Sequence, residues 1–142
     1  MQPRFCYNKR AQETLAAFVN GGRFPHALLL EGPEGSGRRT FAREIAAALF
    51  CRGEHKPCGS CNQCRKVLER NHPDVEYYGG DGSRRSFHID TIRKLRQNAW
   101  LLPGEAPCRA CVLCGAENMT DQAQNALLKI LEEPPEHTVF IL

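Results

Sequence analysis

A short apolar run, a glycine-rich turn and a helical pattern follow one another near the N-terminus, and this order constrains the fold more than any other feature. The run HALLLE occupies residues 26–31, the turn GPEGSG residues 32–37, and FAREIAAALF, at about residues 41–50, places apolar side chains at helical spacing. A continuous apolar run is typical of a strand buried on both faces. Strand, glycine loop and helix in this order predict a phosphate-binding loop, whose backbone N–H groups surround phosphate oxygens.

The remaining sequence continues to alternate between strand-like and helix-like segments. Further strands are expected at residues 73–78, 109–114 and 138–142, and amphipathic helices at residues 10–20, 88–102 and 119–133. Thr120 is placed to cap the last of these helices, and Pro134 to end it. Strands that alternate with helices predict an α/β fold, with a parallel β-sheet covered by helices on both faces. Because the sequence stops on an apolar strand, we expect a truncated domain.

Composition excludes several classes of protein. The 142 residues are enough for one domain with a sizeable core, and 42% apolar and 25% charged residues are ordinary for a globular protein. No apolar run is long enough to span a bilayer, and the N-terminal stretch lacks the charged and then apolar segments of a secretory signal. We therefore expect a cytoplasmic protein with no membrane partner, whose eight cysteines are mostly reduced. A net charge of +3 neither requires nor excludes a nucleic-acid partner.

The glycine loop keeps its backbone but has lost the side chains that act on phosphate and metal. A working loop carries a lysine for the outer phosphates and then a serine or threonine for Mg²⁺, and here these positions read Arg38 and Arg39. The guanidinium group of arginine is larger than the ammonium group of lysine, and it is planar. At the second position, arginine places a positive charge where a hydroxyl should bind Mg²⁺. The hydroxyl of Thr40 comes one residue late, about 100° around the helix. The glycines that remain are Gly32, Gly35 and Gly37.

The second half of a nucleotide-hydrolysing site is missing as well. Such a site needs acidic residues directly after a core strand, where they hold Mg²⁺ and polarise water. Cys114 and Gly115 occupy that place here, and Glu117 follows two residues later. Two independent losses predict that the loop hydrolyses no ATP, and they count against ATP with Mg²⁺ as a cofactor. Binding of an anion or a nucleotide without hydrolysis, and a plain turn between strand and helix, are the open alternatives.

Four closely spaced cysteines predict a metal site directly after the helix that follows the glycine loop. They are Cys51, Cys58, Cys61 and Cys64, in the stretch CRGEHKPCGSCNQC. Two overlapping C-x-x-C units bring three thiolates together, and the first cysteine can fold back as the fourth ligand of a tetrahedral zinc ion. Four thiolates leave no open position, so the zinc is expected to be structural. Redox cysteines, metal-free thiols, His55 in place of Cys51 and a DNA-reading zinc finger are weaker interpretations.

Three further cysteines repeat the three-residue spacing at Cys108, Cys111 and Cys114. Residues three apart on a strand face opposite sides of the sheet, so we expect packing residues here rather than a second metal site. Trp100 and the aromatic residues of VEYY, at 75–78, are likewise expected in the core.

Several of these features together resemble one family. HALLLEGPEGSG, the C-x6-C-x2-C-x2-C module, HPD at residues 72–74 and NALLKILEEPPEHTVFIL at residues 125–142 are similar to bacterial clamp-loader AAA+ subunits of the DNA polymerase III holoenzyme. The gamma/tau branch of that family carries GKT in its phosphate loop and an Asp-Glu pair after the third core strand, whereas the delta-prime branch commonly lacks ATPase competence. Arg38, Arg39, Cys114 and Gly115 make this sequence most similar to the delta-prime branch.

The resemblance implies a non-catalytic subunit that helps to load the sliding clamp onto primer-template DNA, with gamma/tau and delta subunits as partners. It also implies that residues 1–142 are the N-terminal part of an AAA+ P-loop domain, with a zinc-binding module at about residues 51–70. The trans-acting arginine of the family, its sensor residue, its lid and its collar domain would lie beyond Leu142. An ATP-hydrolysing gamma/tau-like motor subunit and an independent zinc-dependent nucleic-acid-binding module are the alternative functions.

Overall fold

Four parallel strands form one sheet in the computed structural model, which describes residues 8–79 and 87–142. The strands are β1 (Ala27–Leu28), β2 (Val75–Tyr78), β3 (Arg109–Leu113) and β4 (Thr138–Ile141), in the spatial order β1-β4-β3-β2. Each neighbouring pair is parallel, which confirms the predicted parallel sheet. All four strands therefore end at the same edge of the sheet, which we call the C-terminal edge. They begin at the opposite edge, which we call the N-terminal edge.

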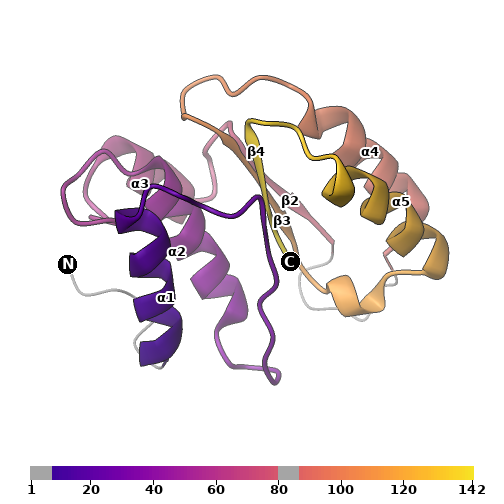
Figure 1. The fold of residues 1–142 in the computed structure, drawn as a ribbon, viewed down its shortest axis with the longest axis horizontal. Coiled ribbons are helices and arrows are strands. Elements are labelled where there is room, and N and C mark those ends of the chain that lie inside the picture. Colours follow the sequence, from indigo (N-terminus) through magenta and orange to yellow (C-terminus); the bar gives the residue numbers. More distant parts are fainter. Residues whose placement is uncertain (1–7, 80–86) are drawn as a thin grey trace.

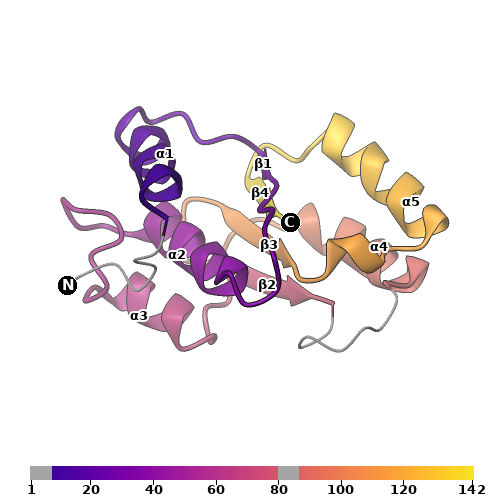
Figure 2. The ribbon, with the colours of Figure 1, turned by 90° about the horizontal axis from the view of Figure 1, so that it is seen from below.

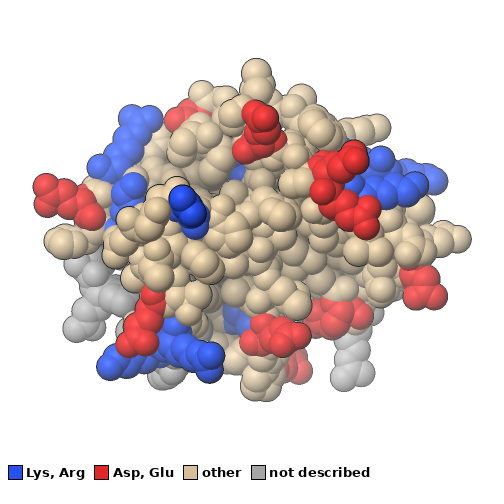
Figure 3. Space-filling model, viewed as in Figure 1, with Lys and Arg blue, Asp and Glu red and all other residues tan. Residues whose placement is uncertain are grey.

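Helices cover both faces of the sheet, as predicted (Figure 1). One layer holds three helices and the other holds two, and Figure 2 shows both layers from below. The first layer contains α1 (Lys9–Asn20), α2 (Arg38–Phe50) and α3 (Asn62–Leu68), and the second contains α4 (Ile89–Ala99) and α5 (Asp121–Glu132). A single 3₁₀ turn, Ala116–Asn118, follows β3. On the face shown in Figure 3, acidic and basic side chains are interspersed around the rim.

Each face of the sheet has its own hydrophobic core, and β3 contributes to both. All five residues of β3 are buried. Ala110 and Val112 lie in the core shared with α2 and α3, whereas Cys111 and Leu113 lie in the core shared with α4 and α5. Successive side chains of a strand point to opposite faces, so an apolar run of this kind requires cover on both sides.

The helix expected at residues 88–102 ends three residues earlier than predicted, at Ala99. The hydroxyl of Thr138 donates a hydrogen bond of 2.7 Å to the carbonyl oxygen of Ala99, which satisfies one of the orphan acceptors at the helix end. The chain then crosses over toward β3 with Trp100 64% exposed and Leu102 76% exposed. The expectation that Trp100 lies in the core was therefore wrong, because the helical periodicity continues in the sequence beyond the point where the helix stops.

The strand expected at residues 26–31 is also shorter than predicted. β1 covers only Ala27 and Leu28, which are half-buried, and the next residue, Leu29, is 66% exposed. Among the described residues β1 pairs only with β4, so it lies at an edge of the sheet. Two hydrogen bonds with Leu142 extend the pairing slightly beyond the strand bounds. The prediction of burial on both faces was wrong because an apolar run does not reveal how many neighbours a strand has.

Candidate metal centre and glycine loop

The four predicted cysteines come together at the N-terminal edge, between α2 and α3. Their sulfur atoms lie within 4.8 Å of one another. Cys51 directly follows α2, Cys61 caps the N-terminus of α3, and Cys64 lies inside that helix. In the part of the chain that the structure describes, this is the one group of cysteine, histidine or acidic side chains with the geometry of a metal site.

Backbone N–H groups surround the sulfur atoms of this cluster. The N–H groups of Gly53 and Cys58 each donate to the Sγ of Cys51 at 3.3 Å. In the same way the N–H of Cys61 donates to the Sγ of Cys58 at 3.3 Å. This bond, followed by hydrogen bonds from Ser60, lowers the pKa of the Cys58 thiol to about 5. The pKa of Cys64 shifts in the opposite direction because its thiol is desolvated by burial. A metal cation would favour the thiolate at the buried position as well.

Close packing around Gly53 also fits a metal site. A Cβ atom at this position would lie 3.0 Å from the Cβ of Cys58 and 3.5 Å from the Sγ of Cys51, so a larger residue would push the ligands apart. Four sulfur donors at this spacing fit a tetrahedral ion such as zinc. Since all four donors come from the chain, the site leaves no position for a substrate.

The three other predicted cysteines lie elsewhere. Cys111 is buried among residues of the α4 and α5 side, whereas Cys108 and Cys114 pack against the core on the α2 and α3 side. This opposite placement follows the alternation of a strand. Burial raises the pKa of Cys108 to about 11 and that of Cys111 to about 12, so both are protonated packing residues at neutral pH.

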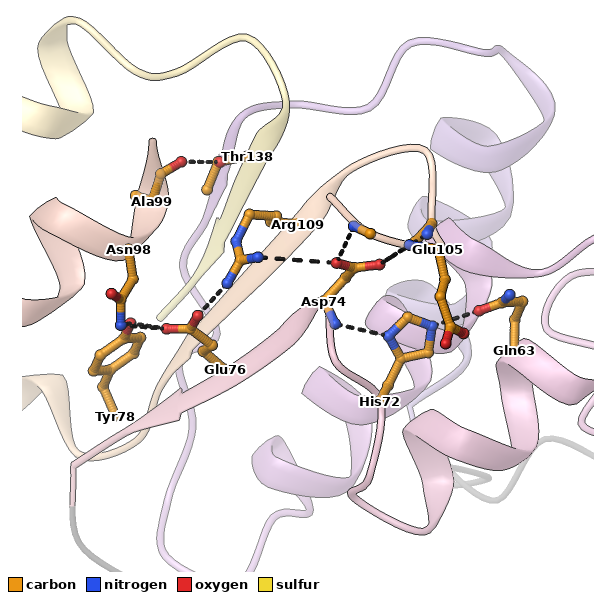
Figure 4. A network of polar contacts seen from close by, with 12 residues as sticks. Gln63, His72, Asp74, Glu76, Tyr78, Asn98, Ala99, Glu105, Arg109 and Thr138 are labelled. Atoms are coloured by element: carbon orange, nitrogen blue, oxygen red, sulfur yellow. Dashed lines mark hydrogen bonds and ion pairs between the residues drawn. The ribbon is translucent and has the colours of Figure 1, made fainter. Parts of the chain in front are cut away.

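A buried carboxylate next to the cysteine module organises the N-terminal edge of the sheet (Figure 4). Asp74, 1% exposed, accepts hydrogen bonds from the N–H groups of Gly104, Glu105 and Ala106 at 2.7, 2.8 and 2.8 Å. Burial alone would raise the pKa of this carboxyl, but the three N–H groups outweigh it and hold the pKa of Asp74 below its usual value. The side chain therefore remains ionised and fixes the loop that leads into β3.

An arginine continues this network across the sheet. The Nη1 of Arg109, the first residue of β3, lies 3.9 Å from Asp74. Its Nη2 forms an ion pair with Glu76 of β2. The carboxylate of Glu76 accepts hydrogen bonds from the hydroxyl of Tyr78 and, at 3.1 Å, from the side chain of Asn98 on α4. A buried charge is tolerated only when it is paired, and here each of the three charged groups has a partner of opposite charge. The Nε of Arg109 is the one buried polar atom of this group without a hydrogen-bond partner among the described residues.

Two contacts tie this network to the cysteine module. His72 bonds through one ring nitrogen to Gln63, a residue of α3, and accepts from the backbone N–H of Asp74 through the other at 3.0 Å. Lys66, also on α3, forms an ion pair of 2.5 Å with Glu105. No role for these residues was predicted from the sequence. The one available signal was the HPD stretch at residues 72–74, in which two titratable side chains directly precede a buried strand.

The glycine loop lies at the C-terminal edge, between β1 and α2. Gly35 and Gly37 have φ angles of 78° and 83°, in the left-handed region that favours glycine. A Cβ atom at Gly32 would come within 2.8 Å of the hydroxyl oxygen of Ser36, so this glycine is needed for a close approach. That hydroxyl is buried and has no hydrogen-bond partner among the residues the structure describes.

The other predicted site residues of this edge are near the loop or follow β3. Arg38 is the first residue of α2 and is half-buried, whereas Arg39 is exposed. Cys114 follows β3 and donates its backbone N–H to Tyr78 at 2.9 Å, and Gly115 turns the chain with a φ of 79°. The remaining residue of the set is Thr40, which is half-buried in the first turn of α2. Neither residue after β3 supplies a carboxylate.

The chain is similar to known subunits of bacterial DNA polymerase III. The family described as DNA polymerase III, delta subunit, matches residues 7–142. A DNA polymerase III subunit delta′ from Yersinia pestis is 37% identical over 123 residues, which cover 85% of this chain and 36% of that protein. A DNA polymerase III subunit gamma/tau from Mycobacterium tuberculosis is 34% identical over 129 residues, covering 89% of this chain and 22% of that protein. The chain thus spans little more than a third of such delta′ relatives.

The fold of the chain also matches a solved structure of a DNA polymerase III subunit-related protein. The crystal structure of a DNA polymerase III gamma subunit-related protein from Thermotoga maritima matches with a TM-score of 0.59 at 26% identity, covering 92% of this chain and 38% of that chain. Within the described residues, no helix is both long enough and apolar enough to cross a membrane. The chain belongs to the family of DNA polymerase III clamp-loader subunits, and within it is most like the delta-prime subunits.

Proposed function

We propose that the chain is the N-terminal part of the AAA+ P-loop domain of a delta-prime-like subunit, which helps to load the sliding clamp onto primer-template DNA in the cytoplasm without hydrolysing ATP. Gamma/tau and delta subunits would be its protein partners. Membership of the family supports this assignment. Because the chain covers 36% of the delta′ relative from Yersinia pestis, the lid and collar would belong to further residues of the protein.

The observation that carries the proposal is the chemistry of the C-terminal edge. Arg38 and Arg39 open α2 at the place of a lysine and a hydroxyl, and no carboxylate follows β3 at Cys114 or Gly115. Mg²⁺ needs oxygen ligands, and hydrolysis needs a group that orients water. A gamma/tau-like motor is the second candidate, because a gamma/tau relative is 34% identical. It would need Arg38 to act as the lysine does, which the planar guanidinium disfavours.

We further propose that Cys51, Cys58, Cys61 and Cys64 hold one structural zinc ion. The four sulfur atoms within 4.8 Å of one another support this, as do the N–H groups directed at three of them. Zinc would fix the end of α2 to the start of α3. The network of Asp74 would then connect this rigid module to the sheet.

The test uses the full-length protein with zinc bound, alone and together with gamma/tau, delta, the clamp and primer-template DNA. We expect no ATP turnover by the isolated protein, and clamp-dependent turnover by the complex only when this protein is present. Arg38→Gln should leave the rate of the complex unchanged, as should Arg65→Gln, a matched change on the exposed side of α3. Turnover by the isolated protein that Arg38→Gln abolishes would instead support the motor.

A further inference from the structure

Two arginines and one tyrosine lie on the side of the sheet covered by α2 and α3. Arg43 belongs to the second turn of α2, Arg70 to the turn after α3, and Tyr77 to β2. None of the three belongs to the cysteine site, to the network around Asp74 or to the glycine loop. Their chemistry therefore needs an explanation of its own.

Two hydrogen-bond donors in this cluster are buried without an acceptor. The hydroxyl of Tyr77 and the Nε of Arg43 both have no hydrogen-bond partner among the described residues. Buried polar groups are almost always paired, and an unpaired one destabilises the folded state. A pair of such donors is the arrangement expected where an acceptor binds from outside the chain.

Arg70 lies over the same tyrosine. The central carbon of its guanidinium group is 5.4 Å from the centre of the Tyr77 ring, within the range of a cation–π contact. The backbone of Arg70 has a φ of 59°, in the left-handed region that glycine usually occupies at the end of a helix. The side chain that lies over the ring belongs to an exposed residue.

The charges of the two arginines act on the tyrosine and are not neutralised. Burial raises the pKa of Tyr77, and the charges of Arg70 and Arg43 act in the opposite direction. In the described part of the chain, neither arginine forms a salt bridge. Cations without a salt-bridge partner among the described residues favour the binding of an anion.

We propose that Arg43, Arg70 and Tyr77 bind a phosphate-type oxyanion. Tyr77 and Arg43 would donate hydrogen bonds to it, and the exposed Arg70 would contribute a further guanidinium group. A phosphate group suits these partners because it offers several acceptor oxygens, and because guanidinium groups bind it through charge-assisted hydrogen bonds. The site is separate from residues 32–40, and it does not depend on the function proposed above.

The first test titrates inorganic phosphate into the full-length, zinc-bound protein at constant ionic strength and follows the ring resonances of Tyr77 by NMR. We expect a saturable shift. Arg43→Gln should weaken the affinity for phosphate by about tenfold or more, and Tyr77→Phe by several-fold. Arg38→Gln in the glycine loop and Arg65→Gln on α3 serve as matched controls and should change nothing.

Three results would overturn the proposal: no saturable binding at millimolar phosphate, unchanged affinity in both Arg43→Gln and Tyr77→Phe, or loss of binding in Arg38→Gln. Zinc content and a thermal melt show whether each variant is folded, and Tyr77→Phe preserves the ring if Arg43→Gln proves unstable. A parallel titration with a single-stranded oligonucleotide distinguishes the source of the phosphate. Tighter binding of the oligonucleotide that Arg43→Gln removes would identify a nucleic-acid backbone, and binding of phosphate alone would identify a free ion.

Discussion

At the N-terminal edge of the sheet, the carboxylate of Asp74 is 1% exposed and accepts three backbone N–H groups, whereas at the C-terminal edge the hydroxyls of Ser36 and Tyr77 are buried with no partner among the described residues. The first region holds its polar groups against one another. The second keeps the backbone of a ligand site, because Gly35 and Gly37 retain their left-handed conformations. Unpaired buried hydroxyls call for an explanation such as a ligand, whereas the carboxylate of Asp74 is fully paired within the chain; the exception at the N-terminal edge is the Nε of Arg109, which has no partner among the described residues.

This difference separates the two kinds of work that the domain can do. The cysteine cluster is linked to the sheet through the contacts of His72 and Lys66, so a metal bound there would stabilise this part of the fold without any further ligand. Under the function proposed above, the glycine loop does not organise Mg²⁺ and water, because it has no lysine and no acidic pair directly follows β3. The N-terminal edge, which we call the rigid region, is the part of the sheet whose charged groups contact one another within the chain.

Removing one buried cysteine should have the largest effect. Cys64→Ser leaves a buried hydroxyl in the place of a zinc ligand, so we expect loss of the bound zinc and a fall of several kcal/mol in the free energy of unfolding. Metal analysis and denaturant unfolding measure the two quantities. Cys108→Ser, a half-buried cysteine outside the cluster, should retain the zinc. Full zinc occupancy and unchanged stability in Cys64→Ser would refute the metal site.

Neutralising the carboxylate of Asp74 should have the second largest effect on stability. Asp74→Asn keeps the size of the side chain but removes the charge that three N–H groups and Arg109 face, and we expect a loss of about 3 kcal/mol in the free energy of unfolding. The control is Asp90→Asn, whose side chain is 85% exposed and whose ion pair with Arg93 should contribute less than about 1 kcal/mol. Equal effects of the two changes would remove the basis for treating the N-terminal edge as the rigid region.

The ionisation of Asp74 should also make the stability of the protein depend on pH. Its pKa is lowered in the folded protein, so the stabilisation is fully present above the unfolded value of about 3.9 and is lost as the pH falls through the folded pKa. The difference in unfolding free energy between the wild type and Asp74→Asn should therefore be constant from pH 7 to about pH 5 and should shrink at more acidic pH. Urea titrations across this range measure it. A difference that already shrinks near neutral pH would point to another group.

Ser36→Ala in the glycine loop should have the smallest effect. Its hydroxyl has no hydrogen-bond partner among the described residues, so its removal should change the unfolding free energy by no more than about 0.5 kcal/mol. Thr120→Ala is the matched change at a hydroxyl that accepts from Ala123 at 3.2 Å, and should cost about 1 kcal/mol. A larger loss in Ser36→Ala than in Thr120→Ala would reveal a function for the loop hydroxyl in the folded protein.

Features that depend on nearby residues were predictable from the sequence. Thr120 and the following helix, the parallel sheet and the grouping of the four cysteines all follow from local spacing. The network around Asp74 was not predictable in this way. Its partners Gly104, Glu105 and Ala106 lie about 30 residues away, and only the fold brings their N–H groups together.

The ends of elements were missed for a related reason. Periodicity placed Leu102 in the helix of residues 88–102, but the acceptor at Ala99 bonds to Thr138, 39 residues away, and the helix stops there. The apolar run at 26–31 likewise gave no sign that β1 has a single neighbour among the described residues. Tertiary contacts determine where α4 ends and how far β1 extends, so local propensity could not predict either.

Calorimetric titration of Mg·ATP into the full-length protein, with zinc bound and an Arg38→Glu variant alongside, tests the central claim most directly. We expect no micromolar binding of Mg·ATP at the glycine loop, so the wild type and Arg38→Glu should give the same weak or absent heat, because the loop has no lysine and no acidic pair follows β3. Micromolar binding that Arg38→Glu abolishes would contradict it, and would make the glycine loop a working nucleotide site.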